Sequence, residues 1–196
     1  MRYRESQKER TRLRVLGEAA AAIRTKGAER VSVGEVMAAA GLTHGGFYAH
    51  FESKDDLIAQ AITHMFDAAY NDRFVRLTEG REPAAAIVSY VDSYLSLLHR
   101  LQRGNGCPIP ALSGDLPNFS ERARERFANG IERVAAGLAE LAKKLGAKDA
   151  EALAWSALAE MAGAIALSRT VSDKRAAQIL RNSRTIVKAR FGVGAR

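Results

Sequence analysis

The only thiol in this 196-residue chain is Cys107, which stands between Gly106 and Pro108. A thiol reacts with oxidants and electrophiles when nearby cations or a helix N-terminus favour its thiolate form. A free cysteine is otherwise a small buried hydrophobic residue. The residues around Cys107 leave both interpretations open. One cysteine cannot form an intrachain disulfide, and this favours a reducing, cytoplasmic location.

The remaining reactive side chains give no sign of catalysis or metal binding. The four histidines, His44, His50, His64 and His99, lack the spacing typical of metal ligands. The chain also contains neither a phosphate-binding glycine loop nor a nucleophile elbow. We therefore predict that the protein is not an enzyme and that it holds no metal and no cofactor.

The formal net charge of +8 is concentrated at the two ends of the chain. Residues 1–14 contain six Lys and Arg against two Asp and Glu, whereas residues 169–196 contain eight against one. A basic surplus is compatible with an acidic partner such as nucleic acid but does not identify one. The first cluster predicts a basic arm that runs into a helix. For the second we expect only a solvated helix face.

Composition favours a globular protein with a hydrophobic core. Hydrophobic residues make up 47% of the chain and charged residues 27%, and about 200 residues suffice to bury a core. The N-terminus carries charges where a signal peptide would be apolar. No run approaches the roughly 18 apolar residues of a membrane span. We expect a cytoplasmic protein without a membrane partner.

Helical signals dominate the whole sequence. Only four prolines occur, three of them between residues 108 and 117, and the long segments between them repeat apolar residues at helical spacing. The fold class predicted is therefore all-α, with about nine helices. We expect them at about 5–26, 32–40, 43–50, 53–77, 84–103, in one turn near 111, and at 118–145, 148–171 and 173–191.

The start and the end of the second helix are unusually explicit. Ser32 and Glu35 have the spacing of a capping box, while Val31 and Val36 occupy the positions of a hydrophobic staple. Gly41 supplies the left-handed conformation that ends a helix. These independent cues predict one short helix with defined boundaries.

A third short helix is expected from Thr43, its predicted cap, to about His50. Ser53 and Asp56 then mark the start of a long fourth helix that extends to about Leu77. Two short helices around a glycine-bearing turn, followed by a long connecting helix, form the layout of a helix-turn-helix unit.

Residues 32–54, SVGEVMAAAGLTHGGFYAHFESK, resemble the DNA-binding segment of the tetracycline-repressor (TetR) family of bacterial regulators. The likeness is carried by the amphipathic helix Val33–Ala40, by Gly41-Leu42, Phe47-Tyr48 and His50-Phe51, and by Lys54. A weaker likeness continues over GCPIPALSGDL (106–116) and GAIALSRTVSD (163–173). The resemblance implies a TetR-like fold, with a helix-turn-helix DNA-binding domain at 1–51 and a helical effector-binding and dimerisation domain at 52–196.

The resemblance also implies which residues contact DNA. The third helix would enter the major groove with its first residues against base edges, while neighbouring groups hold phosphates. Tyr48 and Lys54 match family positions that contact phosphate. Gly45 and Gly46 allow either a close approach of the backbone to DNA or a tight contact between helices, and His50 is either a phosphate contact or a structural residue. The candidate DNA contacts are Ser32, Thr43, His44, Gly45, Gly46, Tyr48, His50 and Lys54.

In the second domain the resemblance implies a ligand pocket and a dimer interface. Apolar groups with a few polar tips are typical of such pockets. The candidate wall residues are Phe66, Tyr70, Tyr90, Tyr94, Cys107, Ile109, Phe127, Trp155 and Met161. The last two helices would pair with those of a second copy, through the alanine-rich face of 152–166 and through Ile179, Leu180, Ile186 and Val187.

The function that follows is a ligand-responsive, homodimeric transcriptional regulator, expected to be a repressor that a small molecule releases from a palindromic operator. Its partners are double-stranded operator DNA, an effector of unknown identity and a second copy of the chain. Two alternatives stay open. One is a repressor that senses electrophiles or oxidants through Cys107. The other is a constitutive architectural protein that binds DNA without sequence choice.

Overall fold

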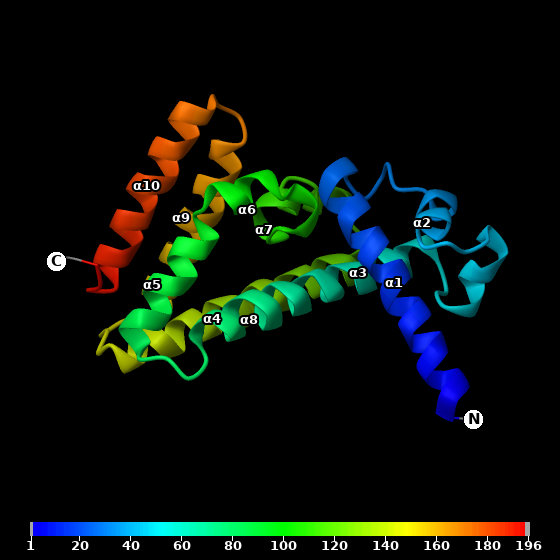
Figure 1. Cartoon of the computed structure of the whole chain (residues 1–196), viewed down its shortest axis with the longest axis horizontal. Helices are drawn as coiled ribbons and strands as arrows, with labels where there is room; N and C mark the ends of the chain where they lie inside the picture. The colour runs from blue at the N-terminus through cyan, green and yellow to red at the C-terminus, as the bar shows by residue number, and fades with distance from the viewer. Residues whose placement is uncertain (1, 195–196) are drawn as a thin grey trace.

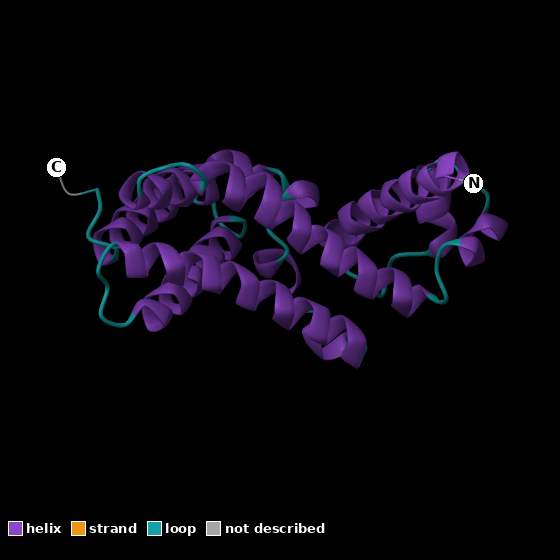
Figure 2. Cartoon of the chain, turned by 90° about the horizontal axis from the view of Figure 1, so that it is seen from below, coloured by secondary structure: helices purple, strands orange, loops and turns teal. Residues whose placement is uncertain are grey.

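The computed structural model describes residues 2–194, and the side chains of residues 7–194. These residues form helices and connecting loops and no strand (Figure 2), so the all-α prediction is confirmed. Ten α-helices occur, at α1 Arg2–Lys26, α2 Val33–Ala39, α3 Lys54–Ala68, α4 Arg76–Thr78, α5 Pro83–Tyr94, α6 Leu97–Leu101, α7 Ile109–Leu112, α8 Glu121–Lys144, α9 Ala150–Ser168 and α10 Asp173–Arg190. Short 3-10 segments lie at η1 His44–Ala49, η3 Arg103–Asn105 and η4 Leu116–Asn118, and a π-helical segment at η2 Ala69–Val75.

The molecule is elongated along a rod made by α3, η2, α4 and α8 (Figure 1). α3 and α8 pack side by side and run in the same direction, since Asp56 pairs with Arg122 and Asp67 with Arg133. α1, α2 and η1 lie at one end of the rod, and α5, α9 and α10 lie at the other. The arrangement places the predicted DNA-binding unit far from the C-terminal helices.

The boundaries of α2 agree with the prediction. The Ser32 hydroxyl accepts a hydrogen bond from the Glu35 amide at 3.1 Å, and Val31 and Val36 are both buried. At the other end Gly41 has a φ of 69°, and the amides of Gly41 and Leu42 donate to the carbonyls of Ala38 and Met37, each at 2.9 Å. This pair of hydrogen bonds is the Schellman motif, which satisfies the last carbonyls of a helix.

The third helix differs from the prediction. Residues 44–49 form a 3-10 helix. Thr43 occupies the N-cap position, as predicted, but its side chain makes no cap hydrogen bond. Two adjacent glycines stabilise a helix poorly. The segment is held instead by the buried Phe47, whose ring stacks on Phe51 with centroids 5.6 Å apart.

The basic N-terminal segment also differs from the prediction in its conformation. It is helical from Arg2 onward, as the first part of α1, rather than an arm that precedes a helix. Its side chains up to residue 6 lie outside the described ones.

The long helix after Ser53 has the predicted extent but not a uniform geometry. Ser53 caps α3 by accepting from the Asp56 amide at 3.1 Å, and helical structure continues to Thr78. Residues 69–75, however, adopt π-helical hydrogen bonding. Such segments widen the helix locally and are frequent at functional sites.

The prediction of a single helix over residues 84–103 is wrong. α5 ends at Tyr94, and a new helix, α6, begins after Ser96, whose hydroxyl accepts from the His99 amide at 3.1 Å. Ser96 acts as an N-cap in the middle of an apolar pattern that otherwise predicts one continuous helix. The break turns the buried His99 toward the following loop.

α8, α9 and α10 begin and end within a few residues of their predicted positions. α9 is the one described helix whose length and mean hydropathy of 1.3 would suffice to cross a membrane. It packs against both α8 and α10, and 44% of this stretch is buried within the chain.

Part of the basic C-terminal surplus is explained by these contacts. Lys188 pairs with Asp92 of α5 and Arg190 with Glu160 of α9, each at 2.6 Å. Arg169 donates to the carbonyls of His99 and Arg100. These cations fasten α10 and the end of α9 to neighbouring helices, so they are more than a solvated face.

Candidate functional site

The 3-10 helix η1 forms an exposed edge of the molecule. Thr43, His44 and Tyr48 are exposed, and Tyr48 is the most exposed large hydrophobic side chain described, at 74%. Its ring meets Phe47 edge-on with centroids 5.2 Å apart. Phe47 therefore anchors η1 in the core, while the tyrosine hydroxyl and the His44 imidazole point outward, free to donate to phosphate or to a base edge.

The glycine pair in η1 is not required by packing. A Cβ on Gly45 would meet no atom within 4 Å, and one on Gly46 would lie at an ordinary distance of 3.6 Å from Met37 Cε. Neither residue has positive φ. The tight contact between helices that the sequence left open is therefore absent here, and this favours a backbone surface open to DNA.

Lys54 lies at the first turn of α3 and is half-buried. Its ammonium donates to the Glu29 carbonyl at 3.0 Å, which fastens the loop between α1 and α2 to α3. Two of its protons are left for another acceptor. Ser32 is exposed at the start of α2, where its oxygen accepts from the Glu35 amide and its hydroxyl proton is free.

His50 follows η1 and faces α1. Burial, together with the nearby cations Lys8 and Arg12, lowers the pKa of His50 below its usual range. The ring is therefore neutral at pH 7, and its Nδ1 has no hydrogen-bond partner. A neutral imidazole contacts phosphate as a single N–H donor rather than as a cation.

A buried carboxylate joins the helix-turn-helix unit to the rest of the chain. Asp56, 3% exposed, forms an ion pair with Arg122 of α8, with 3.0 Å between its Oδ1 and the arginine Nη2, and its Oδ2 accepts from Gln60 at 2.7 Å. Gln60 in turn accepts from Arg12 of α1. α1, α3 and α8 are thus linked through one polar cluster. Sequence reasoning found Asp56 only as part of a capping box, because nothing in the sequence indicates that Arg122 meets it.

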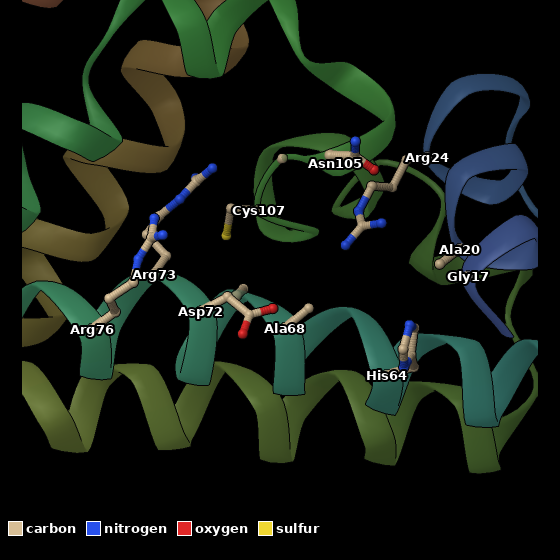
Figure 3. A pocket seen from close by; sticks show the side chains of 12 residues that line it. Gly17, Ala20, Arg24, His64, Ala68, Asp72, Arg73, Arg76, Asn105 and Cys107 are labelled. Carbon is tan, nitrogen blue, oxygen red and sulfur yellow. The ribbon is translucent and has the colours of Figure 1, made fainter. Parts of the chain in front are cut away.

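A cavity of about 310 Å³ lies between α1, the junction of α3 and η2, and the loop after α6 (Figure 3). Arg24 reaches into this space from α1, while Arg73 and Arg76 rise from the helix on the opposite side, near Cys107. The cavity exists because several of its lining residues are glycine or alanine, whose side chains leave space. The lining residues are Gly17, Ala20, Arg24, His64, Ala68, Ala69, Asp72, Arg73, Arg76, Asn105, Gly106 and Cys107.

Cys107 is in an environment that opposes thiolate formation. It is 3% exposed, and burial raises the pKa of its thiol, although the neighbouring Tyr94 side chain and the Ile109 backbone act in the other direction. Of the two interpretations that the sequence left open, the buried neutral thiol is the one that the structure favours.

The loop that carries Cys107 is held by His99. Its Nδ1 lies 2.6 Å from the Tyr94 carbonyl, and its Nε2 lies 2.9 Å from the Cys107 amide nitrogen. Only the neutral tautomer with the proton on Nδ1 satisfies both contacts. Burial is the main cause that lowers the pKa of His99 to about 3.

The candidate pocket residues do not line one common cavity. Cys107 lines the cavity beside Arg24, whereas Tyr70 lines a separate hollow of about 600 Å³ between η2 and α8, and Trp155 is exposed over α9. The other candidates are buried in the core: Phe66, Tyr90, Tyr94, Ile109, Phe127 and Met161. Sequence reasoning missed Arg24 and Arg73, since charged residues on helices ordinarily face solvent.

Some of the predicted dimer residues are exposed, and others are buried within the subunit. Ile186 is 46% exposed on α10, as expected of a contact residue. Trp155, which was expected in the pocket wall, and Leu167, just beyond the predicted face of 152–166, are also exposed, on α9. Leu180 and Val187, which we expected to contact a second copy, are buried within this subunit. Leu180 and Val187 are seven residues apart and therefore share the inner face of α10, whereas Ile186 lies on the outer face.

Metal ligation finds no support among the described side chains, which contain no group of three or more His, Cys, Asp or Glu placed to hold an ion.

Comparison with known proteins agrees with this architecture. Residues 15–61 match the family described as bacterial regulatory proteins, tetR family, and residues 83–182 match the C-terminal domain described as transcriptional regulator LmrA/YxaF-like. No curated protein gives a significant match over the chain.

Solved structures resemble more than nine tenths of the chain. A TetR transcriptional regulator from Chloroflexus aurantiacus is 28% identical, with a TM-score of 0.80 over 94% of this chain and 95% of that one. The reduced form of NemR from Escherichia coli is 22% identical, with a TM-score of 0.79 over 91% and 95%. A TetR-family regulator from Agrobacterium tumefaciens is 17% identical, with a TM-score of 0.79 over 93% and 98%.

Proposed function

Because this chain belongs to the TetR family of bacterial transcriptional regulators, we propose that it acts as a homodimeric repressor, located in the cytoplasm, which a small molecule releases from a palindromic operator. The observation that carries the proposal is the exposed edge of η1, where Thr43, His44 and Tyr48 stand free of the core. Each subunit of the dimer would place this edge in one major groove, with the half-sites related by the two-fold axis.

The exposed apolar residues on α9 and α10 support dimerisation through these helices. Trp155, Leu167 and Ile186 are 41%, 61% and 46% exposed in the single chain. A closed two-fold interface buries the same patch of both copies. Because α9 and α10 lie at the far end of the rod (Figure 1), this pairing leaves η1 accessible to DNA.

An effector releases the DNA only if it binds more tightly to the arrangement that does not bind DNA. The polar cluster around Asp56 links α1 and α3 to α8. Ligand binding next to α8 could therefore change the position of α1 and α3. A shift of α3 relative to α8 would change the separation of the two η1 edges in the dimer.

Selection of bound sequences from random oligonucleotides tests this function. We expect an inverted repeat, bound at least roughly 10³-fold more tightly than scrambled DNA at physiological salt. Binding of both with similar affinity and a steep salt dependence would instead support a constitutive architectural protein. Release of the selected operator by metabolites, retained in the Cys107→Ser variant, would separate a pocket effector from a thiol sensor.

Two groups of substitutions distinguish phosphate contacts from base contacts. We expect Tyr48→Phe and Lys54→Ala to weaken binding to operator and random DNA alike, by roughly tenfold each, because phosphate contacts carry no sequence information. His44→Ala should mainly alter sequence preference. Equal losses on both DNAs for His44→Ala in a fluorescence anisotropy titration would contradict its role in reading bases.

The glycine pair gives a sharper test of the DNA-binding edge. Gly45→Ala adds a methyl group where no atom lies within 4 Å, so the free protein should be as stable or more stable by about 0.5–1 kcal/mol. If the η1 backbone approaches DNA, the same methyl group should weaken operator binding by roughly tenfold or more. A variant with unchanged melting temperature and unchanged operator affinity would show that the backbone at Gly45 stays away from DNA.

A further inference from the structure

The cavity beside α1 contains a buried arginine with an incomplete set of partners. Arg24 is 6% exposed. Its Nη1 donates to the Gly104 carbonyl at 2.9 Å, whereas its Nε is buried without any hydrogen-bond partner. In Figure 3 its guanidinium points into the space between α1 and η2.

A second guanidinium lines the same cavity from the other side. Arg73 lies on the π-helical segment η2, and its Nη1 is also buried without a partner. Arg76 and His64 add further donors, and Asp72 is the one carboxylate in the lining. Among the described side chains, no carboxylate oxygen lies within 4.0 Å of Arg24 or Arg73.

Two unpaired guanidinium groups that share one cavity are an unfavourable arrangement in the empty protein. Burial lowers the pKa of Arg24 to about 10, and the charge of Arg73 acts in the same direction. Arg24 is nevertheless protonated at pH 7. A buried charge without a counterion is strongly destabilising, and a guanidinium presents its donors in the planar fork that matches carboxylate and phosphate.

We propose that this cavity binds a small organic anion, whose carboxylate or phosphate group is held between Arg24 and Arg73. Its volume of about 310 Å³ lies at the lower end of the roughly 300–1,000 Å³ typical of small-molecule sites. The apolar part of the ligand lies against Ala20, Ala68 and Cys107. The proposal rests on the repressor function above and adds the chemical class of the effector.

The position of the two arginines explains how such an anion affects DNA binding. Arg24 belongs to α1, which packs on α2 and α3, and Arg73 belongs to the helix that runs along α8. An anion that bridges them adds a contact whose strength depends on the distance between α1 and η2. The ligand therefore favours one of the two arrangements by its differential affinity.

Calorimetric titration of the purified full-length protein, without DNA, tests the site directly. The probes are benzoate and phenyl phosphate, with benzamide as a neutral analogue of similar shape, all at constant ionic strength. We expect at least one of the two anions to bind with a Kd in the millimolar range or tighter, and benzamide at least roughly tenfold more weakly. The two anions together distinguish a carboxylate site from a phosphate site.

Substitutions locate the binding. Arg73→Gln and Arg24→Gln should each weaken the bound anion by roughly tenfold or more, whereas Arg24→Lys, which keeps a charge but loses the fork, should weaken it less. Arg175→Gln, on the exposed start of α10, makes the same change in net charge and should have no effect. Because Arg24 also holds Gly104, Arg73→Gln is the decisive variant if Arg24→Gln fails to fold.

Three results would overturn the proposal: no binding of either anion up to about 10 mM, equal binding of benzamide, or equal losses for Arg73→Gln and Arg175→Gln. The effector role is then measured separately, as a change in operator affinity on addition of the anion. An anion that binds at Arg73 without changing operator affinity overturns that role. Failure to bind any DNA sequence specifically overturns the repressor function while the calorimetric result stands.

Discussion

Gly130→Ala should destabilise the protein by about 2–3 kcal/mol, one of the largest losses expected from a single added methyl group. A Cβ at Gly130 would lie 2.2 Å from Phe66 Cγ and 2.3 Å from its Cδ2. Cγ lies on the axis about which the ring turns, so turning the ring about its Cβ–Cγ bond does not relieve the contact, and the buried surroundings of Phe66, which is 3% exposed, oppose a change of its rotamer. α3 and α8 must therefore move apart, and this outweighs the gain of about 1 kcal/mol that alanine brings to a helix.

Thermal unfolding at one fixed protein concentration measures this effect. For a chain of this length, 2–3 kcal/mol corresponds to a fall in Tm of roughly 5–10 °C. Gly17→Ala is the matched control, because a Cβ there would meet no atom within 4 Å and should stabilise the helix. Combining Gly130→Ala with Phe66→Leu, which makes room at the contact, should recover part of the loss.

The Gly130 prediction depends on the close approach of α3 and α8. Equal changes in Tm for Gly130→Ala and Gly17→Ala would show that the two helices do not touch at this point. A double variant that is less stable than the two single changes predict together would lead to the same conclusion.

His99→Gln should cost about 2–4 kcal/mol at pH 8 and much less at pH 5. The substitution leaves the Tyr94 carbonyl or the Cys107 amide without its buried partner. The effect depends on pH because the folded chain keeps His99 neutral, with a pKa lowered to about 3, whereas the unfolded chain protonates it near its usual value of about 6.5.

The sign follows from proton binding. Between pH 6.5 and 3 the unfolded chain binds one more proton at His99 than the folded chain does. The stability that His99 contributes is therefore complete above pH 6.5 and falls by about 1.4 kcal/mol for each pH unit below it. His50 and His64 also have lowered pKa values, so wild type loses further stability over the same range.

The difference between wild type and His99→Gln isolates the contribution of His99. Urea denaturation at pH 8 and pH 5 should show a gap in unfolding free energy that narrows by roughly 2 kcal/mol at the lower pH. His44→Gln, on the exposed edge of η1, should give a gap near zero at both values. A gap for His99→Gln that stays constant with pH would mean that the folded protein tolerates a charged His99.

Local signals in the sequence were sufficient for the helix-turn-helix unit. The Ser32 cap and the Gly41 turn have the predicted hydrogen bonds, and the two staple residues Val31 and Val36 are buried; each of these features joins residues no more than five positions apart. Such interactions depend on neighbours along the chain, so their residue types predict them directly.

Geometry that depends on competing local choices was predicted less well. Nothing in the apolar pattern separates a 3-10 helix at 44–49 from an α-helix, or marks the π-helical segment at 69–75. The cap at Ser96 was overlooked because serine also occurs inside helices, with a propensity similar to that of many other residues.

By itself, the sequence determined that this protein is helical, where most of its helices begin and end, and which segment belongs to a helix-turn-helix unit. These properties follow from periodicity, caps and turns, which act over a few residues. Only the tertiary structure brought Arg24 and Arg73 to one cavity, Arg122 to Asp56, and Gly130 against Phe66. The members of each of these pairs lie about fifty residues or more apart, and helix packing alone sets the distance between them.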